Sequence, residues 1–329
     1  MASPNSTFTE MVTTTLREHP SEVADNVSQH NALYRRLKVN GKIKKLDGGY
    51  EIVRPLDYQE NSTYQRYSGY DALNIGASDV LTAAKYDWVQ AAVHVTASGR
   101  ELRMNSGKNQ LIDLAASRTK NAMRTAANNM STDLYSSGSL QNQMGGLGLI
   151  ISTAGTGIVG GIDSGTYTWW ANQFLEASGT NTYRSGAATD VYLFRQDMMT
   201  LWMNCTRGTD QPDLIVSSQD FYNAFWGSLV PNQRYTSDDK EATAGFNSLR
   251  FQQADVIFDR ESTNFATTAE KMYFLNSNYL ELCVHRSANW TTLDDKLSVN
   301  QDAVVIPIIF QGQLTCSNRA RQGILIDAS

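Results

Sequence analysis

Cysteine is scarce in this sequence of 329 residues, which has only Cys205, Cys283 and Cys316. Their odd number and wide spacing exclude a framework of disulfides and any paired-cysteine zinc site. The four histidines show no spacing that is typical of metal ligands. We therefore expect a protein of a reducing compartment that uses no metal and no other cofactor.

Long apolar runs are also missing. The longest candidate, Ala303 to Phe310, is far shorter than the ~20 residues that cross a bilayer. The first seven residues are polar and lack the apolar centre of a secretion signal. These absences predict a soluble intracellular protein with no membrane partner.

Charge is sparse, because Asp, Glu, Lys and Arg make up 19% of the chain, against ~25% in typical soluble proteins. Asn, Ser, Thr and Gln together contribute about 100 residues. A surface with few charges suits burial against other proteins, since unpaired charges are costly to desolvate. The net charge of -5 argues against nucleic acid as the main partner. Apolar residues make up 41%, enough for a folded core.

Signatures of catalysis are missing as well: there is no Walker A loop, no HExxH and no GxSxG. Residues 155–160 match the GxGxxG fingerprint, but the glycines that follow exclude the helix that this fingerprint needs. The acidic pairs at 238–239 and 294–295 lie in polar stretches that are typical of solvated loops, although glycosidase-type carboxylates stay open. We expect that the protein is not an enzyme.

Between Gly107 and Gly138 there is neither glycine nor proline, and apolar residues recur at helical spacing. A helix of about 27 residues would be ~40 Å long. Many of the side chains on its apolar face are alanine, which lets another backbone approach closely. The predicted packing residues are Leu111, Ala115, Ala122, Ala126 and Met130.

Residues 48–95 predict a projecting hairpin. A strand from Tyr50 ends at Pro55, a second strand runs from about Val80 to Val95, and a polar stretch with tyrosines lies between them. A loop this long and this poor in aliphatic residues has no core of its own. Tyrosines with little charge around them favour an interface, and a mobile surface loop is the alternative. The candidate interface residues are Arg54, Tyr58, Tyr64, Arg66, Tyr67 and Tyr70.

The rest of the chain predicts a mixed α+β domain. A helix is expected over Ser21 to Lys38 with Gly41 after it, and 190–204 reads as a strand entering a helix. Short strands and helices alternate up to residue 297. Two strands finish the chain, 303–310 and 323–326, and Pro307 confines the first to an edge or a bulge.

This order of elements resembles the major capsid proteins of tailed bacteriophages, which have the HK97-like fold. The glycine-rich stretch Gly145–Ile150, leading to Gly160–Asp163 and then to Trp169–Trp170, resembles the segment that follows the long helix in many of these proteins. The resemblance implies an N-terminal arm (1–47), an E-loop hairpin (48–95) and a P domain with the spine helix (96–145). It further implies an A domain with the glycine-rich connection (146–297) and a return to the P domain (298–329).

The same resemblance implies the function and the partners. Copies would form the hexamers and pentamers of an icosahedral shell around double-stranded DNA, with the E-loop lying over a neighbouring subunit. A separate scaffolding protein is expected, because the N-terminus lacks the long charged helix that some relatives use as a built-in scaffold. A portal is a further expected partner, and a cement protein is a possible one. The protein would assemble in the host bacterial cytoplasm and reside in the virion. DNA contact would be weak, with Arg319 and Arg321 presenting local positive charge inward.

Two alternatives stay open. An encapsulin-like cellular compartment would use the same fold, and a polysaccharide-active enzyme would be a monomer with a carboxylate cleft. Some relatives join an E-loop lysine to an asparagine of a neighbouring subunit, but no lysine lies between Gly48 and Asp79. We therefore expect a shell that its own chemistry does not cross-link.

Overall fold

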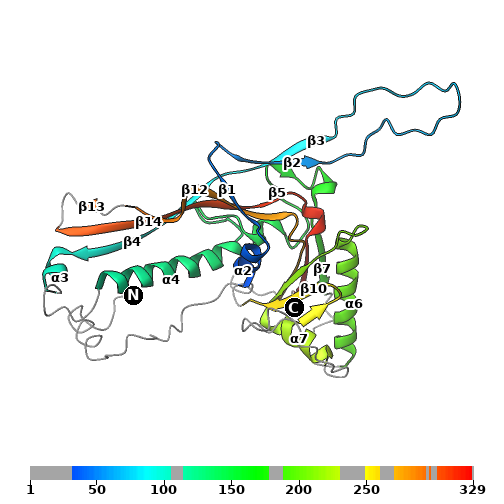
Figure 1. The fold of residues 1–329 in the computed structure, drawn as a ribbon. Helices are drawn as coiled ribbons and strands as arrows, with labels where there is room; N and C mark the ends of the chain where they lie inside the picture. Colours follow the sequence, from blue (N-terminus) through cyan, green and yellow to red (C-terminus); the bar gives the residue numbers. More distant parts are fainter. Residues whose placement is uncertain are drawn as a thin grey trace. The chain divides into compact units, whose positions relative to one another are not determined.

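The computed structural model describes residues 32–104, 114–177, 188–229, 249–259, 270–293, 296–297 and 302–327, and it confirms the α+β class. The helical elements are α2 (Ala32–Val39), α3 (Gly99–Met104), α4 (Leu114–Leu134), α5 (Leu147–Ile150), α6 (Ala188–Cys205) and α7 (Gln219–Leu229), with the short turns η2 (Thr168–Trp170) and η6 (Arg319–Arg321). Figure 1 shows these elements along the chain.

The strands of the first half are β1 (Ile43–Leu46), β2 (Ile52–Asp57), β3 (Leu81–Tyr86), β4 (Val89–Ser98), β5 (Ile158–Val159), β6 (Ile162–Asp163) and β7 (Gln173–Ala177). Those of the second half are β8 (Leu214–Ser217), β9 (Leu249–Phe251), β10 (Ala254–Phe258), β11 (Glu270–Leu275), β12 (Leu280–Thr292), β13 (Lys296–Leu297), β14 (Ala303–Cys316) and β15 (Gly323–Asp327). Among the described residues, one compact unit comprises 90–131 and 287–311, and the other comprises 32–89, 132–286 and 312–327.

The first unit packs the long helix α4 against strands. Ala122 of α4 packs in a small core with Val95 of β4 and Ile308 of β14. β4 and the antiparallel β13 both pair with β14. β14 thus has several strand neighbours, and the prediction that Pro307 lies at an edge or a bulge of this strand stays a prediction. The Pro307 carbonyl accepts a hydrogen bond from the Leu293 N–H at 2.9 Å, one residue after β12 ends.

The second unit is built on a six-stranded sheet in the order β7-β15-β11-β8-β10-β9. The prediction of a strand entering a helix at 190–204 is wrong, because α6 covers the whole stretch. Phe194, Met198, Leu201 and Cys205 recur at spacings of three and four and are fully buried in the core that α6 shares with α7 and the sheet. At Gly323 a Cβ atom would lie 2.6 Å from the Cys205 sulfur, so this glycine permits the close approach of α6.

The hairpin differs from its prediction in two ways. β2 continues through Pro55, which pairs with Ala83; a proline is tolerated there because β2 has no second neighbour in the two-stranded β2–β3 ribbon. The predicted second strand is two strands, β3 and β4, which break at 87–88 and enter different sheets. Of the predicted helix that starts at Ser21, only its end is described, as α2.

Candidate assembly interface

Within the second unit, the β2–β3 ribbon is attached to β12 and β14 through Arg54. Its guanidinium pairs with the Glu281 carboxylate, and its Nε donates to the Thr315 hydroxyl at 3.1 Å. The Arg54 side chain is only 13% exposed. The structure therefore places this predicted interface residue inside its own subunit, where it anchors the base of the hairpin.

Two further contacts hold the ribbon in place. The Tyr86 hydroxyl donates to the Cys316 carbonyl at 2.8 Å, and burial raises the pKa of Tyr86. The Lys85 N–H donates to the carbonyl of Gly160 at 2.9 Å. Gly160 has a φ of +62°, and a Cβ there would lie 2.7 Å from Ala84, so the glycine-rich segment can approach the ribbon only with glycine at this position.

Beyond the last strand pair, residues 58–80 form a long loop, which we call the distal loop (Figure 1). Its backbone is held by its own polar side chains rather than by a ladder. Gln65 donates to the Ala72 carbonyl at 2.9 Å and accepts from the Asn74 N–H at 3.2 Å, while Asp71 accepts from the Ser68 N–H at 2.9 Å. The distal loop is thus shaped locally without a core.

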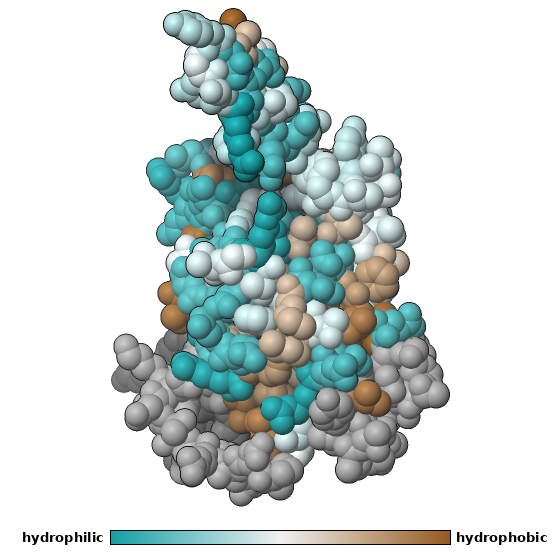
Figure 2. All heavy atoms as spheres, turned by 90° about the vertical axis from the view of Figure 1, so that its right-hand side faces the viewer, coloured by the Kyte–Doolittle hydropathy of each residue, from teal (hydrophilic) through white to brown (hydrophobic). Residues whose placement is uncertain are grey.

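The distal loop exposes an unusual share of large apolar side chains. Tyr70 and Ile75 are 107% and 94% exposed, and the other exposed residues are Tyr64, Tyr67 and Leu73. Arg66 is exposed as well. Figure 2 shows the protruding part at the top of the view as mostly teal and pale, with a brown atom at its upper edge. Apolar groups on a projecting polar loop are typical of a surface that becomes buried against a partner.

The root of the distal loop contacts the glycine-rich segment through aromatic rings. The ring centroids of Tyr58 and Trp169 are 5.6 Å apart, and those of Trp169 and Trp170 are 5.7 Å apart. Trp170 is fully buried and donates to the Val159 carbonyl at 3.0 Å. Among the candidate interface residues, Tyr58 therefore lies at the root with Arg54, whereas the other tyrosines belong to the exposed part of the distal loop.

Arg319 has a structural role, and the prediction that it presents positive charge toward DNA is wrong. It is fully buried instead of presenting charge inward. Its Nε donates to the Ile150 carbonyl at 2.6 Å, and its Nη2 donates to Asn172 Oδ1 at 3.0 Å. Its Nη1 lies 3.3 Å from the Ser164 hydroxyl and 3.5 Å from the Gly157 carbonyl. One guanidinium thus organises the whole glycine-rich segment, and nothing in its sequence neighbourhood signals this role.

The predicted packing residues of the long helix divide into two groups. Ala122, Ala126 and Met130 are buried on α4. Leu111 lies outside the described residues, and Ala115 lies within α4. The packing role of these two stays a prediction.

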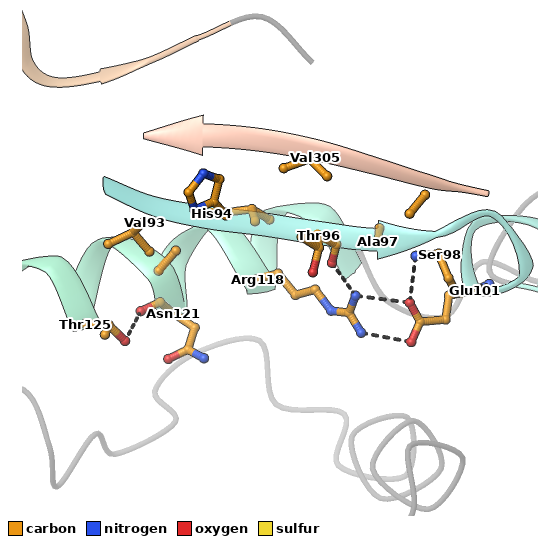
Figure 3. Close-up of a pocket in the computed structure, with 13 residues that line it drawn as sticks. Val93, His94, Thr96, Ala97, Ser98, Glu101, Arg118, Asn121, Thr125 and Val305 are labelled. Carbon is orange, nitrogen blue, oxygen red and sulfur yellow. Dashed lines mark hydrogen bonds and ion pairs between the residues drawn. The ribbon is translucent and has the colours of Figure 1, made fainter. Parts of the chain in front are cut away.

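Beside Ala122, the first unit has an open pocket of about 690 Å³ between β4 and α4 (Figure 3). Arg118 on α4 donates to both oxygens of Glu101, at 3.0 and 3.1 Å, and to the Thr96 carbonyl at 2.6 Å. Ser98 and Glu101 form a reciprocal capping box at the start of α3. The polar groups of this pocket thus bond to one another and join α4 to the end of β4.

This ion pair predicts a pH dependence. The hydrogen bond from Arg118 holds the pKa of Glu101 below its ordinary value of 4.5. The interaction of the two side chains therefore stabilises the fold fully above about pH 4.5, and this stabilisation is lost as the pH falls through the lowered pKa. Replacing Glu101 with glutamine is expected to lower the free energy of unfolding by about 0.5–1.5 kcal/mol at pH 7. Urea unfolding at pH 7 and pH 3 measures this, and an equal loss at both values would contradict it.

Within the described ranges, no group of three or more His, Cys, Asp or Glu side chains is placed to hold a metal ion. The described helices include none with the length and apolar character needed to cross a membrane. The three cysteines are buried as free thiols.

No protein-family model and no curated protein matches the sequence. Solved structures do match it over nearly its whole length. The capsid of cyanophage A-1(L) has a TM-score of 0.63 at 16% identity, covering 94% of this chain and 95% of that one. The capsid of Myoviridae phage XM1 has a TM-score of 0.58 at 11% identity, covering 88% and 91%.

A shell protein from a cell matches as well. The SrpI encapsulin of Synechococcus elongatus has a TM-score of 0.56 at 9% identity, covering 98% of this chain and 95% of its own. Together with the long helix, the mixed sheet and the projecting hairpin, these matches confirm the expected architecture. The chain adopts the HK97-like capsid fold.

Proposed function

We propose that this chain is the major capsid protein of a tailed double-stranded DNA bacteriophage. In this proposal it self-assembles into the hexamers and pentamers of an icosahedral shell that encloses the genome, and it has no catalytic role. The observation that carries the proposal is the distal loop, a segment rooted firmly in its subunit that exposes Tyr64, Tyr67, Tyr70 and Ile75. The fold shared with phage capsids supports the same conclusion.

The physical reason for assembly lies in the way the loop is built. Its root is fixed by a partly buried ion pair at Arg54 and by the Tyr86 hydroxyl. Its outer part makes few contacts with the rest of its subunit; one is the exposed pair of Glu60 and Arg207 at 3.6 Å. Such a pair is worth at most ~1 kcal/mol. A fixed root with an unburied apolar end presents a complementary patch to a second copy, which a closed symmetric shell needs.

We base the proposed domains, partners and location of the protein on its resemblance to phage capsid proteins. The N-terminal arm (1–47), E-loop (48–95), P domain (96–145), A domain (146–297) and returning segment (298–329) would be the working parts of the subunit. A scaffolding protein, a portal, a possible cement protein and packaged DNA would be its partners. Assembly would take place in the host bacterial cytoplasm, and the product would be part of the virion.

Light scattering of the purified full chain tests this function. We expect particles of many copies rather than a monomer of 36.5 kDa. A protein that stays monomeric at all concentrations, with and without a co-expressed scaffold, would overturn the proposal. It would favour the enzyme alternative instead.

An encapsulin-like compartment is the second candidate, and the match to the SrpI encapsulin favours it. The two candidates differ in what the shell encloses. Particles from infected cells should protect genome-length DNA from nuclease if the first proposal holds. Particles that instead retain a protein cargo and no protected DNA would favour the second.

We also predict a shell without self-made covalent cross-links. The lysine nearest to the distal loop in the sequence is Lys85, which lies on β3 with its ammonium 3.6 Å from the Glu51 carboxylate. The loop itself offers Arg66, whose guanidinium stays protonated and is no nucleophile. Particles boiled in detergent with reductant should release one band at the monomer mass. A surviving ladder of multimers would refute the prediction.

A further inference from the structure

Positive charge is concentrated in one short segment of this acidic chain. Six of the eleven residues from Arg35 to Lys45 are basic and none is acidic, whereas the whole chain has 33 acidic and 28 basic residues. We call this segment the basic strip. Its basic residues are Arg35, Arg36, Lys38, Lys42, Lys44 and Lys45.

The local fold presents the basic strip on a defined backbone. Leu33 and Leu37 are buried and fix one face of α2. Gly41, with a φ of +66°, ends the helix, and the Lys42 N–H donates to the Leu37 carbonyl at 2.8 Å while the Gly41 N–H donates to the Lys38 carbonyl at 3.2 Å. This is a Schellman motif. β1 follows directly, and among the described strands it pairs only with β12, so the β1 part of the strip lies at an edge of the sheet.

The acidic groups near the strip are engaged by arginines. Asp255 pairs with Arg36 at 2.6 Å and with Arg250 at 3.3 Å. Glu281 pairs with Arg54, and Asp47 with Arg286 at 2.9 Å. The arginines therefore neutralise the local carboxylates.

The lysines of the strip are left with little compensation. Lys38 and Lys45 are exposed, and neither forms an ion pair within the described part of the chain. Lys42 donates to the neutral Asn278 at 3.3 Å. Lys44 is 53% exposed and lies 4.0 Å from Glu281, which Arg54 already engages.

Two ordinary explanations account for single residues. A lysine on an edge strand prevents unwanted pairing, and a basic residue in the last turn of a helix interacts favourably with its dipole. Neither explains why helix, turn and strand are all basic in a chain whose net charge is -5. Exposed lysines with little ionic compensation among the described residues, Lys38, Lys44 and Lys45, suit a polyanionic partner.

Resting on the proposed capsid function, we propose that the basic strip contacts the phosphate backbone of the enclosed nucleic acid. Lysine ammonium groups neutralise phosphates as point charges and read no base sequence. The contact would hold DNA of any sequence, and it would be weak at physiological salt because it rests on few charges. The basic strip, rather than the buried Arg319, would then supply the local positive charge that faces the DNA.

The test measures binding of a fluorescent 20-base-pair duplex to the full-length chain by anisotropy between 50 and 200 mM NaCl. The variant carries Lys38→Gln, Lys44→Gln and Lys45→Gln. Each phosphate contact contributes about 0.9 to the slope of log affinity against log salt. We expect the slope to fall by about 2–3 in this variant, and the matched Lys→Arg triple to retain the wild-type slope.

A control triple removes the same charge elsewhere, with Lys85→Gln, Arg100→Gln and Lys120→Gln, all at exposed positions outside the distal loop. It should keep the wild-type slope. An equal decrease of the salt slope in both triples, or an unchanged salt slope in the strip variant, would overturn the proposal. So would a strip variant that keeps duplex binding but loses binding to polyglutamate, because the strip would then serve an acidic protein.

A single Lys45→Gln variant guards against a folding defect in the triple and should lower the slope by about 0.9. Particle formation is scored separately by negative-stain microscopy. Wild-type protein that binds duplex through the strip but forms no shell would refute the capsid function alone. Shells that form normally while the strip variant binds duplex like wild type would refute the strip alone.

Discussion

Replacing Arg319 with methionine is expected to destabilise the second unit by about 3–5 kcal/mol, because it strands several buried acceptors at once. The Ile150 carbonyl and Asn172 Oδ1 would lose donors that now lie at 2.6 and 3.0 Å. Each buried polar group left without a partner costs about 1–3 kcal/mol. Methionine fills part of the volume, so the effect isolates the hydrogen bonds and the charge.

Arg321 provides the matched control for this substitution. It lies two residues away on η6 and is only half-buried. Arg321→Met is expected to change the free energy of unfolding by less than about 1 kcal/mol. Urea unfolding followed by tryptophan fluorescence measures both variants. Similar stability of the two would show that the buried guanidinium does not organise the glycine-rich segment.

Removing the distal loop is expected to abolish assembly while leaving the subunit folded. The variant replaces residues 59–79 with Asn-Gly, which suits a two-residue hairpin turn. Tyr58 and Val80 already approach each other, since the Tyr58 N–H donates to the Val80 carbonyl at 3.1 Å. The loop buries little against its own subunit, so the melting temperature should change little. Light scattering should show no particles.

A gentler variant separates loop chemistry from loop length. Tyr64→Ser, Tyr67→Ser and Tyr70→Ser keep the backbone but remove the exposed rings, and they should raise the concentration needed for assembly at least tenfold. Tyr50→Ser is the control, because Tyr50 is 94% exposed but lies before β2. Insoluble deletion protein, or normal shells built without the loop, would count against the assembly role.

The architecture was predictable where the signal is local. The absence of glycine and proline before Gly138 predicted the long helix, and α4 ends at Leu134. Alternation of short elements predicted the mixed domain. The stretch at 190–204 was predicted wrongly because the apolar residues Val191, Leu193 and Phe194 form a pattern that is typical of a strand. The spacing of Phe194, Met198 and Leu201 over the longer segment is typical of a helix, and the structure follows this longer pattern.

Features that depend on distant partners were not predictable. Arg54 pairs with Glu281, more than two hundred residues away, so a hairpin arginine was interpreted as an interface residue. Arg319 bonds to groups between 150 and 172, and a buried arginine has the same local sequence as a solvated one. Pro55 lies within a strand because β2 has a single neighbour, which only the topology reveals.

Electron cryomicroscopy of assembled particles, at a resolution that shows side chains, would reveal directly whether the distal loop joins one copy to the next. We expect Tyr64, Tyr67, Tyr70 and Ile75 of one copy, all exposed in the isolated chain, to be buried against a second copy at every equivalent position of a closed shell. A closed shell in which these side chains remain in solvent would contradict this expectation.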